Sequence, residues 1–157
     1  MPLFEGAIFS VEHRDDRDVV VKGPAVAIVA VDRDEHVTLV RQLRVPAGGP
    51  VLELPAGLID PGEVPLDAAR RELAEETGLY GGEWVEIATF FTSPGFTDEK
   101  MHLFLATGLE AGAAAPQEDE QLEIVRVPLA EIPSLIEESE DGKTLVGLLF
   151  LARYRHL

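Results

Sequence analysis

The sequence lacks cysteine, long apolar runs and an excess of basic residues. Because none of its 157 residues is Cys, disulfides, thiolate zinc sites and cysteine nucleophiles are excluded. No uninterrupted apolar run reaches the length of a membrane span, and no basic region followed by an apolar run opens the chain. We therefore expect a soluble, cytoplasmic protein with no membrane association. The chain has 13 Lys and Arg residues against 29 Asp and Glu residues. The resulting net charge of −16 opposes binding to nucleic acid.

The residues that are present predict one α/β domain covering residues 1–157. A hydrophobic content of 46% in 157 residues is enough for one core and too little to expect two. Two β-branched runs, residues 24–32 and 36–44, flank a polar turn and predict a hairpin. Further strands are expected at residues 84–91, 100–109 and 122–129, and helices at residues 64–78, within 129–140 and at 143–157. This pattern predicts helices covering a mixed sheet.

A cluster of glutamates lies in the helix predicted for residues 64–78. Glu72 and Glu76 are one helical turn apart on the same face, with Glu75 to one side. The Gly- and Pro-rich stretch 53–63 predicts a tight loop that can bring a backbone carbonyl beside these carboxylates. Hard oxygen ligands of this kind suit Mg²⁺, whereas a solvated acidic face is the alternative. The spacing alone leaves both interpretations open.

The same stretch resembles the signature of the Nudix hydrolases. That signature places a Gly, a loop Glu, an Arg-Glu pair, two further glutamates and a second Gly at fixed spacing. Every specified position is filled here, by Gly57, Glu63, Arg71, Glu72, Leu73, Glu75, Glu76, Gly78 and Leu79. The resemblance implies a Nudix-type α/β/α sandwich with a mixed sheet and metal-dependent hydrolysis of a diphosphate joined to another moiety.

The resemblance also implies roles for individual residues. Glu72 and Glu76 would bind Mg²⁺ or Mn²⁺, and Glu75 would be a third ligand or the catalytic base. Ala56 would offer its backbone carbonyl to the metal. The residues that would support the site are Gly57, Glu63, Arg71 and Gly78, with Arg71 orienting the carboxylates.

A second resemblance, to the ADP-ribose pyrophosphatase subgroup, narrows the substrate. Pro94 lies fifteen residues after Leu79, within the stretch SPGFTDE, which is similar to the marker of that subgroup. The stretches LVRQLR before the signature and EDEQLEIV after it are also similar to the subgroup. The likeness runs from about Pro24 to the predicted C-terminal helix.

By this likeness, four more residues belong to the site. Arg44 would lie close to the substrate phosphates, Phe96 would shape the pocket, and Glu99 would lie near the metal or the diphosphate. Glu120 would correspond to a loop glutamate that acts as general base or makes a further metal contact.

The N-terminal residues depart from the subgroup pattern. Members usually begin with a longer sheet segment that is exchanged within a dimer and helps hold adenine, whereas only 23 residues precede Pro24 here. We therefore expect residues 1–23 to form a short arm that can contribute to a homodimer contact. Phe4 and Phe9 could stack on a base, but anchoring in the core is the more common role of such residues and is the expectation here.

The predicted activity is hydrolysis of a small-molecule nucleotide, ADP-ribose, to AMP and ribose 5-phosphate. The alternatives within the family are GDP-sugars, dinucleoside polyphosphates and coenzyme A, and the acidic charge argues against capped RNA. A non-catalytic nucleotide-binding module is a further alternative. Such modules typically lose signature glutamates that this chain retains.

Overall fold

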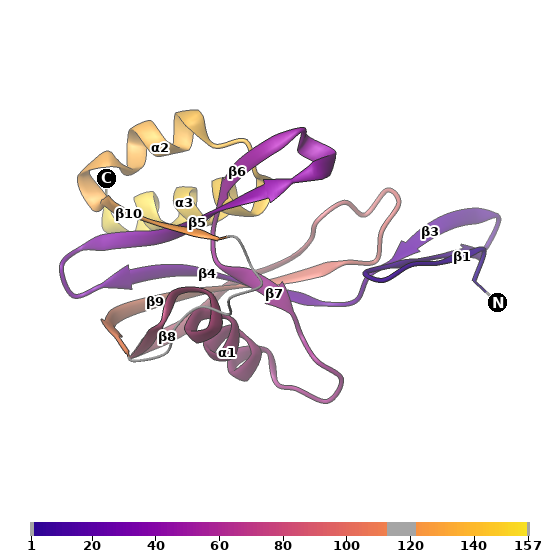
Figure 1. The fold of residues 1–157 in the computed structure, drawn as a ribbon, viewed down its shortest axis with the longest axis horizontal. Coiled ribbons are helices and arrows are strands. Elements are labelled where there is room, and N and C mark those ends of the chain that lie inside the picture. The colour runs from indigo at the N-terminus through magenta and orange to yellow at the C-terminus, as the bar shows by residue number, and fades with distance from the viewer. Residues whose placement is uncertain (1, 113–121, 157) are drawn as a thin grey trace.

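The computed structural model describes residues 2–112 and 122–156, and a mixed sheet forms its centre (Figure 1). The strands are β4 (Ala25–Asp32), β5 (His36–Arg44), β6 (Gly49–Glu53), β7 (Ala56–Leu58), β8 (Leu79–Phe91), β9 (Lys100–Ala111) and β10 (Glu123–Pro128). Their order is β10-β5-β4-β9-β8, with β6 paired to β5 and β7 paired to β4. β4 and β9 are parallel, whereas the neighbouring pairs are antiparallel.

Helices cover both faces of this sheet and confirm the expected α/β class (Figure 1). On one face α1 (Pro65–Thr77) packs Ala69 and Leu73 against Ile28 of β4. On the other face lie α2 (Ile132–Glu138) and α3 (Gly142–Arg155), and Leu148 of α3 packs in the cluster that contains Val29. Every residue of β4 is buried because this strand is covered on both sides.

The ends of α1 and α3 follow from local sequence. Pro65 opens α1 in the position where a missing N–H costs nothing, and Gly78 ends it at φ 72°, with its N–H donating to Ala74. Asp141 caps α3 by accepting a hydrogen bond from the Thr144 N–H. Short 3₁₀ turns occupy Val45–Ala47 and Leu129–Glu131.

The N-terminal residues form a separate small sheet that the sequence analysis did not predict. β1 (Phe4–Glu5), β2 (Ser10–Arg14) and β3 (Arg17–Val21) pair antiparallel and extend from one end of the body (Figure 1). The turn between β2 and β3 uses two aspartates with positive φ, as a two-residue hairpin turn of this hand requires.

The expectation that Phe4 and Phe9 anchor the core was wrong. Their rings lie 5.8 Å apart on the small sheet, and the two residues are 53% and 37% exposed. The small sheet is too thin to bury them.

Two other elements differ from expectation. The stretch predicted as an irregular loop contains β7, which pairs with the start of β4. β8 begins at Leu79, ahead of the predicted start at residue 84, because residues 79–81 already pair with β9. Gly81 and Gly82 adopt positive φ within the strand, which glycine does readily. Within the described residues, no helix has the length and apolar character needed to cross a bilayer.

Candidate active site

Arg71 of α1 gathers three carboxylates. Its Nε and Nη2 donate to the two carboxylate oxygens of Glu63, each at 2.9 Å. Nη1 donates to Glu72 Oε1 at 2.8 Å and to Glu75 Oε2 at 3.4 Å. Nη2 also donates to the carbonyl of Leu58 at 3.1 Å, which ties the helix to β7. The guanidinium of Arg71 thus bonds three carboxylates, two from α1 and one from the loop that precedes it.

The same contacts set the protonation of Glu63. The hydrogen bonds from Arg71 lower the pKa of Glu63 to about 2, and the N–H of Asp60 adds to this effect by donating at 3.0 Å. The carboxylates in turn raise the pKa of Arg71, with Glu63 the largest contributor. Glu63 therefore stays ionised throughout the neutral range and keeps Arg71 in place.

β7 approaches the helix so closely that a side chain at Gly57 would displace a carboxylate of α1. A Cβ on Gly57 would overlap the carboxyl group of Glu72. The N–H of Ala56, one residue earlier, donates to Glu76 Oε2 at 3.2 Å, and Glu76 is only 8% exposed. The structure thus brings Ala56, Gly57, Glu72 and Glu76 together, and the contact seen for Ala56 is through its N–H.

The donor set fits a hard divalent cation. Glu72, Glu75 and Glu76 supply carboxylate oxygens on one stretch of α1, with neither thiolate nor imidazole among them, and this chemistry suits Mg²⁺ or Mn²⁺. In residues 2–112 and 122–156, no group of three or more His, Asp or Glu side chains is arranged to hold a metal ion. Arg71 forms ion pairs with two of the three α1 carboxylates, those of Glu72 and Glu75.

Arg44 lies at the end of β5 and is held by a residue that the sequence analysis missed. Its Nε and Nη2 donate to the two oxygens of Glu53 at 2.7 and 2.9 Å. This pairing raises the pKa of Arg44, and the negative charges of Asp141 and Glu76 act in the same direction. Arg44 is therefore within electrostatic reach of Glu76. A glutamate in the apolar run VLELP was the only signal for Glu53.

The loop at residues 93–99 joins the small N-terminal sheet to the body. Val20 N donates to the Phe96 carbonyl at 2.8 Å, and Lys22 Nζ donates to Glu99 Oε1 at 2.7 Å. Glu99 Oε2 accepts from the hydroxyl of Thr92 at 2.8 Å. Phe96 is 57% exposed. The contacts of Glu99 thus hold the N-terminal arm against the body. Glu120, which was also expected in the site, lies outside the described residues.

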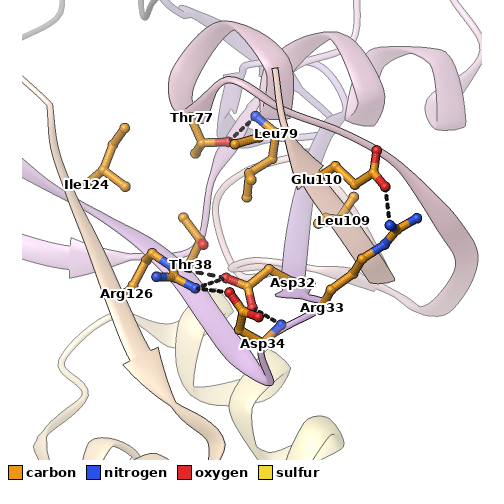
Figure 2. A pocket seen from close by; sticks show the side chains of 11 residues that line it. Asp32, Arg33, Asp34, Thr38, Thr77, Leu79, Leu109, Glu110, Ile124 and Arg126 are labelled. Carbon is orange, nitrogen blue, oxygen red and sulfur yellow. Dashed lines mark hydrogen bonds and ion pairs between the residues drawn. The ribbon is translucent and has the colours of Figure 1, made fainter. Parts of the chain in front are cut away.

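A pocket of about 530 Å³ lies beyond the C-terminal end of α1 (Figure 2). Its described lining residues, none of which is a signature glutamate, are Asp32, Arg33, Asp34, Thr38, Thr77, Leu79, Leu109, Glu110, Ala111, Ile124 and Arg126. Arg126 Nε donates to Asp32 Oδ2 at 2.9 Å, and Arg33 pairs with Glu110. The sequence analysis treated the Asp32 region only as a turn.

The ionisation of Asp32 is set by opposing effects. Burial raises its pKa, but the hydrogen bonds from Arg126 and from the N–H groups of His36 and Asp34 outweigh burial, so the pKa lies below its usual value. Asp32 is thus a paired, structural carboxylate that closes the hairpin.

Comparisons with known proteins agree with this geometry. The NUDIX domain model matches residues 21–146. The chain is 38% identical to the ADP-ribose pyrophosphatase of Bacillus subtilis (strain 168) over 139 residues, 86% of this chain and 75% of that protein. It is 34% identical to the GDP-mannose pyrophosphatase of Citrobacter koseri over 150 residues, 88% of this chain and 78% of that protein. The crystal structure of an ADP compounds hydrolase superimposes with a TM-score of 0.83 at 26% identity, covering 98% of this chain and 90% of that one. With its glutamates gathered around Arg71 against β7, this chain belongs to the NUDIX domain family of hydrolases.

Proposed function

We propose that this protein hydrolyses the diphosphate of a nucleoside diphosphate sugar, most specifically ADP-ribose, to AMP and ribose 5-phosphate. The observation that carries the proposal is the packing of the Glu72 carboxyl group against Gly57, which faces a carboxylate-rich helix toward β7. The similarity to an ADP-ribose pyrophosphatase over most of the chain supports the choice of substrate.

In this proposal the carboxylates of Glu72, Glu75 and Glu76, with the Ala56 carbonyl, hold Mg²⁺ or Mn²⁺. A divalent cation there supplies neutralisation of the diphosphate charge and lowers the pKa of a bound water. Glu75 or Glu120 accepts the proton of the attacking water. Arg71 keeps the carboxylates oriented, since it bonds Glu72 and Glu75 from one guanidinium nitrogen.

Arg44 is the proposed phosphate contact outside the helix. A guanidinium suits this role because it offers several N–H donors to phosphate oxygens. Glu53 uses two of these donors, and 45% of the Arg44 side chain remains exposed. Phe96 is proposed to shape the substrate-binding pocket, which is distinct from the pocket of Figure 2, because it is exposed on the loop that carries Glu99.

GDP-mannose is the second candidate substrate, favoured by the similarity to a GDP-mannose pyrophosphatase over 88% of this chain. The chemistry at the diphosphate would be the same. The base would differ, and adenine and guanine present different hydrogen-bonding edges.

Product analysis of the purified chain tests the proposal. The protein is incubated with ADP-ribose, GDP-mannose, coenzyme A and diadenosine polyphosphates, each with Mg²⁺, Mn²⁺ or chelator. Metal-dependent release of AMP, fastest from ADP-ribose, is the expected result. Faster cleavage of another compound would rule out ADP-ribose as the preferred substrate but would support diphosphate hydrolysis. If none of the compounds is cleaved, a non-catalytic binding module is favoured.

The homodimer and the cytoplasmic location stay predictions, as does the treatment of residues 1–157 as one domain. The dimer is supported by the apolar side chains that the small N-terminal sheet exposes, among them Leu3, Phe4 and Ile8. Light scattering of the full chain, and of a variant with Phe4 and Ile8 changed to Ser, measures whether this surface holds two copies together.

A further inference from the structure

The N-terminal end of α3 contacts Glu53, the residue that holds Arg44. Lys143 Nζ donates to Glu53 Oε2 at 2.6 Å and to Asp141 Oδ2 at 3.0 Å. Thr144 Oγ1 donates to the same Asp141 oxygen at 2.6 Å and accepts from the N–H of Leu54 at 2.9 Å. A helix far along the chain is thus bonded to two consecutive residues at the end of β6.

Burial makes the contact between Lys143 and Glu53 energetically important. Glu53 is 3% exposed and the Lys143 side chain 14% exposed. A carboxylate in such surroundings must be compensated by cations or hydrogen-bond donors. Burial alone raises the pKa of Glu53, but the hydrogen bonds from Arg44 and Lys143 more than offset it, so the pKa lies below its usual value. Glu53 is therefore ionised and shared between two cations.

This sharing matters for what Arg44 can do. Glu53 binds Arg44 through both of its oxygens, and Lys143 donates to one of the same two oxygens. Lys143 is itself fixed by Asp141, whose Oδ2 also accepts from the Thr144 N–H at 3.0 Å. Glu53 is thereby held by α3 in the position from which it orients Arg44.

We propose that Lys143 is a positioning residue for substrate binding: by holding Glu53 it orients Arg44 toward the substrate diphosphate. The inference rests on the proposed function, in which Arg44 contacts the phosphates. Lys143 itself touches no substrate. It acts on the binding of the anion and not on the chemical step, which belongs to the α1 glutamates on the other face of the sheet.

A double-mutant cycle separates this role from simple packing of α3. The variants are Lys143→Gln, Arg44→Gln and the two together, with Lys143→Arg as the conservative change and Lys100→Gln as the control. Lys100 serves as the control because it is an exposed lysine at the start of β9, with its ammonium 5.8 Å from the Phe91 ring. KM and kcat are measured for the diphosphate that the wild-type protein cleaves fastest, at saturating metal, and each melting temperature is recorded.

The expected result is a change in KM that depends on Arg44. Lys143→Gln should raise KM about 3- to 10-fold, the size expected for weakening a charge-assisted contact, with kcat changed less than about twofold. Lys143→Arg should recover most of the loss, and Lys100→Gln should leave KM unchanged. In the Arg44→Gln background, Lys143→Gln should raise KM no further.

Two results would overturn the inference while leaving the proposed function standing. One is an equal rise in KM from Lys143→Gln with and without Arg44, and the other is a lower melting temperature with KM unchanged. If Arg44→Gln itself leaves KM unchanged, the proposed phosphate contact fails and the inference fails with it. A wild-type protein that cleaves none of the tested diphosphates overturns both.

Discussion

The glutamate site on α1 and the pocket beyond its C-terminal end hold similar charged residues in different balance. In the pocket Arg126 pairs with Asp32 and Asp34, Arg33 pairs with Glu110, and Asp32 also accepts two backbone N–H groups (Figure 2). On α1, Arg71 donates hydrogen bonds to three carboxylates, those of Glu63, Glu72 and Glu75. Two guanidiniums thus pair with three carboxylates in the pocket, whereas a single guanidinium bonds three on and beside α1, and the larger excess of negative charge favours an added cation. This difference in charge balance, more than the size of a cavity, supports placing the proposed metal site on α1.

Among the variants that test this comparison, Glu72→Gln should have the largest effect on kcat/KM. Replacing a carboxylate by an amide removes one negative charge from the proposed ligand set, and kcat/KM should fall by at least about 100-fold. The fold should be retained because the side chain keeps its size. The measurement is kcat/KM over a titration of Mg²⁺, with circular dichroism as the check on folding.

Glu137→Gln is the matched control, since this exposed glutamate lies on α2 on the opposite face of the sheet. It should leave kcat/KM unchanged within about twofold. Near-normal turnover by Glu72→Gln would remove the glutamate site from the mechanism and with it the contrast.

Gly57→Ala tests whether the position of Glu72 matters, beyond its charge. The new Cβ would overlap the Glu72 carboxyl group, which can swing away because it is the end of a flexible side chain. We expect kcat/KM to fall about 10- to 100-fold with little change in melting temperature, since a displaced ligand disturbs the site and not the core. Gly49→Ala, where a Cβ meets nothing within 4 Å, is the control. Equal activity of the two variants would mean that the close approach of β7 has no catalytic consequence.

Glu63→Gln should have a smaller effect on activity, about 10-fold, because Glu63 orients Arg71 and is not a proposed ligand. Its effect on stability should depend on pH. The folded-state pKa of about 2 lies below the usual value of 4.5, so the stabilisation is complete above about pH 4.5 and is lost as the pH falls toward 2. Melting temperatures of the wild-type and variant proteins should therefore differ most at neutral pH and converge on acidification. A difference that is constant with pH would show that the Glu63 to Arg71 contact does not carry the effect.

Much of this site could be predicted because its residues are close together in sequence. The spacing of Glu72, Glu75 and Glu76 follows from helix periodicity, and the stretch that contains Gly57 and Glu63 precedes the helix directly. The buried strands β4 and β9 were equally visible as apolar runs.

The parts that could not be predicted depend on contacts between distant segments. Lys143 meets Glu53 across 90 positions of the chain, and no local pattern marks either residue as a partner of the other. The N-terminal sheet was not predicted because its strands are short and partly exposed, without an alternating buried face. The pocket was not predicted for a related reason. Asp and Arg are common in turns and on strand surfaces, so Asp32 and Arg126 did not mark a pocket.

Arg126→Gln should have the smallest effect on catalysis and tests the other half of the contrast. Asp32 would keep its two backbone donors and lose its cation, which should lower stability by about 1 kcal/mol, or about 3 °C in melting temperature. Since no signature glutamate lines the pocket, kcat/KM should change less than about twofold. A loss of activity as large as that of Gly57→Ala, at unchanged melting temperature, would instead make the pocket part of the substrate site. The ion pair of Asp32 and Arg126 would then contribute to substrate binding, and the difference in charge balance would no longer separate the two regions.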